Sequence, residues 1–165
     1  MIKDINNEFA NMPRNYEKTI PSMEKDNIKK GDDFEEYVAN LYPESDYTIV
    51  EWTTDTVRKH KRYVEADTRP DLLIRHKLSG EQFYVECKYR SYTIDNKIIW
   101  TNAEQLKRYQ EFSKEKEEPV FIIIGLGGSP KRPESLFCIP LEDAKYTELY
   151  LNDINQFRRN REYFN

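Results

Sequence analysis

Hydrophobic and polar residues follow two spacings along the chain, one helical and one with a period of two. Phe34, Val38 and Leu41 fall on one helical face, with Asp32 as a candidate N-cap. The run Val120–Gly125 is almost wholly apolar, as expected for a strand covered on both faces. The predicted elements are a helix over residues 32–41, a strand over 47–52, a hairpin of strands 70–77 and 81–89, a helix over 100–117, strands over 120–125 and 136–141, and a closing helix over 146–157. This order predicts an α/β domain built around a mixed sheet.

The first 30 residues differ from the rest of the chain. They are polar and weakly patterned, and Pro13 and Pro21 interrupt any long helix. We therefore expect an N-terminal arm over residues 1–30, loosely structured or with one short helix, and a single domain over residues 31–165. The chain length of 165 residues fits one domain.

Composition narrows the class of protein. Only 38% of the residues are hydrophobic, and no apolar run approaches the roughly 20 residues of a membrane span. The N-terminus lacks the apolar stretch of a secretory signal. Cys87 and Cys138 are far apart and show no metal-ligand spacing, so neither a disulfide scaffold nor a zinc site is expected. These features predict a cytoplasmic protein with no membrane partner.

Candidate chemistry gathers on the predicted hairpin. Side chains in a strand alternate between faces, so Glu86 and Lys88 share one face while Val85 and Cys87 share the other. Asp71 stands at the start of the partner strand, directly after Pro70. An Asp, a Glu and a Lys are thus expected to converge at one edge of the hairpin.

This trio suits phosphodiester hydrolysis. Asp71 and Glu86 can hold Mg²⁺ through oxygen ligands, and the backbone carbonyl of Cys87 is a natural extra ligand. Such an ion neutralises charge on the phosphate and lowers the pKa of bound water, while Lys88 can orient that water. The alternative is an ordinary charged face, because Glu and Lys pair well on a solvated sheet.

The motifs also occur in a known order. Pro70-Asp71 precedes an apolar strand, and Glu86-Cys87-Lys88 ends the returning strand. Upstream, Gly31 is followed by Glu35 on a helix, and downstream Gln105 and Tyr109 are one helical turn apart. In this arrangement, residues 31–141 resemble the PD-(D/E)xK nuclease superfamily, particularly its restriction-endonuclease-like and junction-resolvase-like members.

The resemblance implies a restriction-endonuclease-like core, with a central four- to five-stranded mixed sheet flanked by helices. It implies that Asp71 and Glu86 are the metal carboxylates for Mg²⁺, which Mn²⁺ can replace, and that Lys88 orients water. Glu35 would add a carboxylate and Gln105 would support the lysine or the phosphate. Glu35 also has a structural alternative, since it follows Asp32 at the spacing of a capping box.

Basic and aromatic residues indicate where DNA would lie. The net charge of −4 excludes a generally basic nucleic-acid coat, so any DNA binding must depend on local positive charge at a cleft. The nucleic-acid-binding candidates are Arg58, Lys59, Lys61, Arg62, Arg69, Arg90 and Tyr109. Two alternatives stay open: the basic run over 58–62 can be a solvated loop that protects an edge strand, and Tyr109 can be a core residue.

Together these observations predict a Mg²⁺-dependent endonuclease that hydrolyses phosphodiester bonds in DNA. The alternatives are a catalytically inactive nuclease-fold module that binds nucleic acid or a protein partner, and a structural protein with a charged sheet face. Many members of such families act as dimers, so a homodimer is also to be considered.

Overall fold

The computed structural model describes residues 16–53 and 69–161. It contains one five-stranded sheet, in the order β1-β2-β3-β5-β6, and a two-stranded sheet of β4 and β7. The elements are α1 Tyr16–Asn40, β1 Tyr47–Trp52, β2 Leu72–His76, β3 Gln82–Arg90, β4 Lys97–Ile99, α3 Ala103–Glu115, β5 Val120–Leu126, β6 Ser135–Pro140, β7 Glu148–Tyr150 and α4 Leu151–Ile154, with 3₁₀ turns η3 Leu141–Asp143 and η4 Asn155–Phe157. The predicted mixed sheet flanked by helices is confirmed.

Strand β3 lies at the centre of the main sheet and extends beyond its neighbour β2. It pairs antiparallel with β2, where Leu72 faces Val85, and parallel with β5 along its whole second half. Residues 86–90 of β3 therefore have a strand partner on only one side among the described residues. This open stretch of β3 is where the predicted motif lies.

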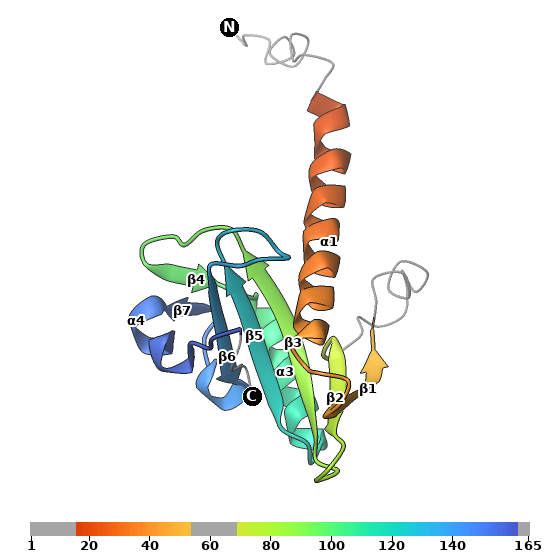
Figure 1. Cartoon of the computed structure of the whole chain (residues 1–165). Coiled ribbons are helices and arrows are strands. Elements are labelled where there is room, and N and C mark those ends of the chain that lie inside the picture. The colour runs from red at the N-terminus through yellow and green to blue at the C-terminus, as the bar shows by residue number, and fades with distance from the viewer. Residues whose placement is uncertain (1–15, 54–68, 162–165) are drawn as a thin grey trace, which may run out of the picture.

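A helix covers each face of the sheet, with α1 in front of it and α3 behind it in Figure 1. On the α1 face, Phe34 and Val38 belong to a core cluster with Val85. On the α3 face, Leu106 and Phe112 belong to the second cluster. Residues of β3 alternate between these two clusters, as the period of a strand requires.

Glycine 125 fixes how closely α1 approaches the sheet. A Cβ atom at Gly125 would lie 2.5 Å from Cε2 of Phe34, so only a glycine leaves room for that ring. Phe34 is fully buried there and precedes Glu35 on the helix. The contact therefore helps to set the position of Glu35 relative to β3.

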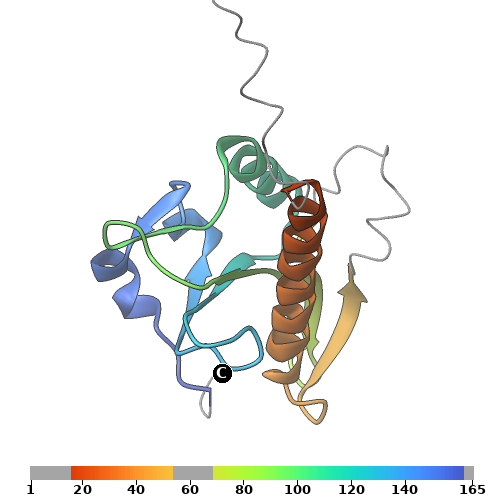
Figure 2. The ribbon, with the colours of Figure 1, turned by 90° about the horizontal axis from the view of Figure 1, so that it is seen from above.

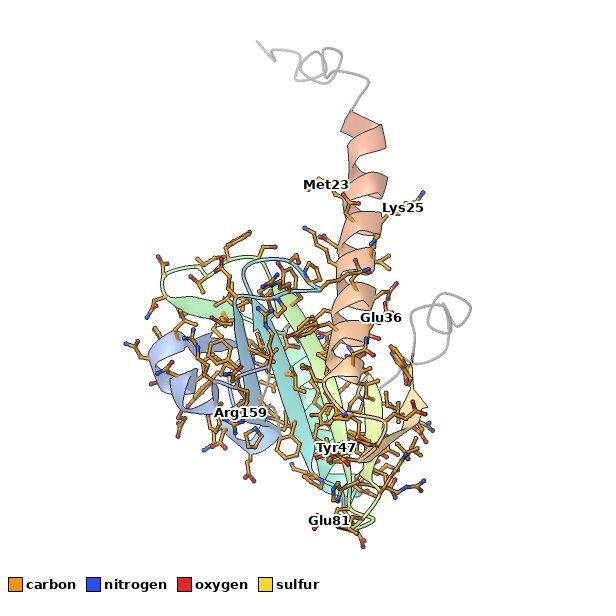
Figure 3. The ribbon with its side chains drawn as sticks, viewed as in Figure 1. Met23, Lys25, Glu36, Tyr47, Glu81 and Arg159 are labelled. Atoms are coloured by element: carbon orange, nitrogen blue, oxygen red, sulfur yellow. The ribbon has the colours of Figure 1, made fainter. Side chains whose placement is uncertain are left out.

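Two predictions about helices were wrong. Helix α1 begins at Tyr16, not at Asp32, and continues through Pro21 and Gly31. Its N-terminal half extends beyond the sheet, where Met23 and Lys25 are exposed (Figure 3), and it contains Pro21, a residue that ordinarily interrupts a helix. The division into an arm and a domain at residues 30 and 31 stays a prediction, although α1 crosses it unbroken.

The closing helix over 146–157 is replaced by β7, the short helix α4 and a 3₁₀ turn. Strand β7 pairs antiparallel with β4, and Ile98 and Leu149 face each other as buried residues. Strands of three residues are too short for their alternation to be recognised in a sequence. Within the described ranges, no helix has the length and apolar character needed to cross a membrane.

Candidate active site

The side chain of Asp71 caps the open edge of β3. Its Oδ2 accepts a hydrogen bond from the backbone N–H of Cys87 at 2.8 Å, and Cys87 lies two residues beyond Val85, the last β3 residue that pairs with β2. Asp71 is only 2% exposed and Glu86 only 3%, so both carboxylates are buried at this edge. Buried carboxylates require polar partners or a cation.

Glu86 is held by two donors that share one of its oxygens. The hydroxyl of Tyr109 donates to Glu86 Oε1 at 2.6 Å, and Lys88 Nζ lies 3.0 Å from the same atom. The Lys88 ammonium also lies 5.8 Å from the centre of the Tyr109 ring. Because β3 alternates, Glu86 and Lys88 both face α3, and the helix brings Tyr109 onto them.

A third buried carboxylate, that of Glu35, comes from α1. The indole N–H of Trp52, at the end of β1, donates to Glu35 Oε2 at 3.3 Å. The capping-box alternative does not apply, because Asp32 lies within the helix rather than at its N-terminus.

The carboxylates produce a strongly negative environment at the centre of the site. Burial, and then the charges of Asp71 and Glu35, raise the pKa of the Cys87 thiol well above its ordinary value. The thiol is therefore protonated at neutral pH. Burial disfavours any charge at this place, whereas the negative charges of Asp71 and Glu35 disfavour an anion and favour a cation.

These residues line a cleft of about 630 Å³ between α1 and the segment that follows β3. The lining residues are Asn27, Ile28, Lys30, Gly31, Glu35, Asp71, Glu86, Cys87, Lys88, Tyr89, Arg90, Ser91, Tyr92, Ile94, Lys97 and Ile99. Asp71, Glu86, Lys88 and Glu35 thus meet in one hollow, although they come from separate parts of the chain.

The oxygen atoms of Asp71, Glu86 and the Cys87 carbonyl are those that could hold a hard divalent cation. Among the described residues, no group of three or more His, Cys, Asp or Glu side chains is arranged to hold a metal ion by itself. What the site offers is Asp71, Glu86 and the Cys87 carbonyl, which faces the same edge as the Cys87 N–H because both groups of a strand residue point the same way. Mg²⁺ is typically bound by one or two carboxylates and keeps several waters.

Gln105 does not contact this constellation. Its side-chain Oε1 accepts a hydrogen bond from the hydroxyl of Thr101 at 2.9 Å, and Gln105 is not among the residues that line the cleft. The two residues predicted as a polar pair on α3 therefore have different partners. Tyr109 contacts Glu86, whereas Gln105 bonds to Thr101 at the start of its own helix.

Three of the predicted DNA-binding residues, Arg69, Arg90 and Tyr109, lie in the described part of the chain. The guanidinium of Arg90 donates to the carbonyls of Ile99 and Trp100 at 2.7 Å each, and its burial lowers its pKa. Arg90 lines the cleft, and its donors bond to the backbone of the segment that precedes α3. Arg69 is exposed and lies 3.6 Å from Glu51. The basic residues Arg58, Lys59, Lys61 and Arg62 lie outside the described residues.

The sequence predicts the burial of Tyr109 on α3 but not its hydrogen bond to Glu86. With Leu106 and Phe112 it forms the buried face of α3, which a helical periodicity can predict. A buried tyrosine hydroxyl usually finds a hydrogen-bond partner, and on this face the candidate acceptor is Glu86. That reasoning could have assigned Tyr109 to the carboxylate rather than to DNA.

Comparison with known proteins gives a fold-level relationship. No protein-family model matches the chain, and no curated protein matches its sequence. Among solved structures, the chain is similar to Hjc, a Holliday junction resolvase from the archaeal hyperthermophile Archaeoglobus fulgidus, with a TM-score of 0.52 and 10% sequence identity. The match covers 78% of this chain and 93% of that one. The chain therefore shares the fold of that structure, which is the restriction-endonuclease-like fold expected from the sequence.

Proposed function

We propose that this protein is a metal-dependent endonuclease that hydrolyses phosphodiester bonds in DNA. The observation that carries the proposal is the meeting of Asp71, Glu86 and Lys88 in one cleft at the open edge of β3. Acidic and basic side chains buried this deeply are uncommon outside paired or functional sites. The similarity to a Holliday junction resolvase supports a nuclease fold and is consistent with DNA as the substrate.

The carboxylates of Asp71 and Glu86, with the Cys87 carbonyl, would hold Mg²⁺ or Mn²⁺. When bound, such an ion supplies charge neutralisation at the scissile phosphate and lowers the pKa of a nearby water molecule. Asp71 is oriented for this role by the Cys87 N–H at 2.8 Å. Glu35, which lines the same cleft, would add a carboxylate through water or at a second ion.

Lys88 would act on the water and the phosphate. Its ammonium group lies 3.0 Å from Glu86 and therefore beside the metal ligands. In that position it can donate a hydrogen bond to the attacking water and offset negative charge that develops on the phosphate. Tyr109 would keep Glu86 in place while Lys88 changes partner, because the tyrosine donates to Glu86 independently.

The test is nicking of supercoiled plasmid DNA with Mg²⁺, with chelator as the first control. Asp71→Asn and Lys88→Ala should each lower the rate by about a hundredfold or more while the far-UV circular dichroism spectrum is unchanged. The matched controls are Glu111→Gln and Lys107→Ala, which alter an exposed acid–base pair on α3 at 3.8 Å and should leave the rate unchanged.

Wild-type rates in both site variants would refute the assignment, as would equal nicking in chelator. DNA binding without any cleavage, by a folded wild-type protein, would favour the inactive nuclease-fold module instead.

A further inference from the structure

The two walls of the cleft differ in their chemistry. The wall from α1 includes the polar side chains Asn27, Lys30 and Glu35, of which Glu35 is buried, and the half-buried Ile28. The opposite wall, between β3 and β4, includes Tyr92, Ile94 and Ile99. These three are among the nine large hydrophobic side chains that are exposed in the described part of the chain. In Figure 2 the segment that bears them (green) extends away from α1 (red to orange).

The apolar wall is held by a tight hairpin. The N–H groups of Ile94 and Lys97 each donate to the carbonyl of the other residue, at 2.9 Å. Asp95 and Asn96 between them have φ values of 50° and 59°, the left-handed conformation of a two-residue type I′ turn. Arg90 also donates to the Ile99 carbonyl at 2.7 Å. The exposed side chains are thus displayed on an ordered backbone.

The charges on the two walls differ as well. Lys97 stands on the apolar wall, but it lies 2.9 Å from Glu148 and its ammonium is over the Tyr150 ring at 5.3 Å. Its charge is therefore largely compensated. Lys30, on the α1 wall, makes no ion pair with another described residue and is exposed. The α1 wall thus offers phosphates the exposed ammonium of Lys30, while the carboxylate of Glu35 on the same wall is buried, and the opposite wall suits flat, uncharged surfaces.

We propose that the cleft accepts an unpaired strand of DNA, with its phosphates toward α1 and its bases against Tyr92, Ile94 and Ile99. A continuous duplex carries phosphates on its whole outer surface, and an apolar wall would have to desolvate them. An unpaired strand exposes base faces, which stack on aromatic side chains at any sequence. The inference rests on the proposed function, which takes DNA as the substrate. It adds that the DNA strand is unpaired where it enters the cleft.

The test is binding of fluorescently labelled oligonucleotides in chelator, at one fixed salt concentration, measured by anisotropy with the full chain. The single strand should bind more tightly than a duplex of the same sequence. Tyr92→Ala should weaken single-strand binding about tenfold and change duplex binding little. The matched control is Tyr146→Ala, because Tyr146 is 73% exposed, Tyr92 is 72% exposed, and only Tyr92 lines the cleft.

Equal or tighter duplex binding would overturn the inference, as would equal effects of the two tyrosine substitutions. A change in oligomeric state on Tyr92→Ala, without a change in strand preference, would assign this wall to a second copy of the chain and would also overturn it. Since no cleavage is measured, the outcome is separate from that of the nicking assay. A protein that nicks duplex plasmid but prefers no unpaired strand would retain the proposed function and lose this inference alone.

Discussion

Replacing Tyr109 by Phe removes a single hydroxyl from the site and leaves the ring in place. That hydroxyl donates to Glu86 Oε1 at 2.6 Å, in surroundings where Glu86 is 3% exposed. The ring stacks on Trp100, with 6.0 Å between centroids, and this packing is retained in phenylalanine. The substitution therefore isolates the hydrogen bond.

The expected loss of stability follows from the partners that remain. A hydrogen bond to a charged group contributes about 1.5–3 kcal/mol. Lys88 still lies 3.0 Å from the same oxygen, so Glu86 is not left without a partner. We expect a loss of about 2 kcal/mol, which lowers the melting temperature of a domain of this size by about 4–8 °C. We also expect Mn²⁺ affinity to fall by at least about tenfold, because Glu86 loses the group that orients it.

The measurement is urea unfolding in chelator, followed by Mn²⁺ titration calorimetry. The control is Tyr84→Phe. Tyr84 is buried on the same face of β3, its ring contacts Phe112, and its hydroxyl has no hydrogen bond to another described residue. Its loss should stay below about 0.5 kcal/mol. If the Tyr109 variant is no less stable than the Tyr84 variant, the hydroxyl does not hold Glu86 and the reasoning is refuted.

Three further predictions concern packing, thiol chemistry and DNA affinity. Gly125→Ala should destabilise the fold by about 1–3 kcal/mol in urea denaturation, because its Cβ would meet Phe34 at 2.5 Å. Gly31→Ala, whose Cβ would have no atom within 4 Å, should stabilise α1 by about 0.5–1 kcal/mol in the same assay. A change of stability in the same direction for both variants would contradict this reasoning. Burial raises the pKa of the Cys138 thiol from 9.0 to about 11. Its alkylation by iodoacetamide at pH 8, followed by mass spectrometry, should therefore be about a hundredfold slower in the folded than in the unfolded protein. Equal alkylation rates would show that the folded thiol is ionised and would contradict this prediction. Neutralising the basic run over residues 58–62 should weaken DNA binding and flatten its salt dependence. An unchanged salt dependence would favour the alternative, in which the run is a solvated loop.

The sheet was predictable because its signals are local. The alternation in residues 81–89 and the short turn at 78–80 define the hairpin, and β2 and β3 follow that pattern. Once Leu72 faces Val85, Asp71 must lie beside Glu86 at the end of the ladder. The convergence of the two acids and the lysine thus follows from strand periodicity together with the register that the hairpin turn sets.

Other features depend on contacts between distant segments. The side chains of Gln105 and Tyr109 differ by about 40° around the helix, and only packing against the sheet decides which of them reaches Glu86. Arg90 looked like a phosphate ligand, but backbone carbonyls of the segment before α3 take its donors. The sheet of β4 and β7 joins residues about 50 positions apart, a pairing that no local pattern marks.

The most direct test of the proposed site is X-ray diffraction from crystals soaked in Mn²⁺, with an anomalous difference map. One strong peak is expected within coordination distance of the carboxylates of Asp71 and Glu86 and of the Cys87 carbonyl, at about 2.0–2.4 Å. The same peak should be absent from Asp71→Asn crystals grown and soaked alike. A map without a peak at these oxygens, from crystals in which Mn²⁺ is visible elsewhere, would contradict the metal-dependent mechanism.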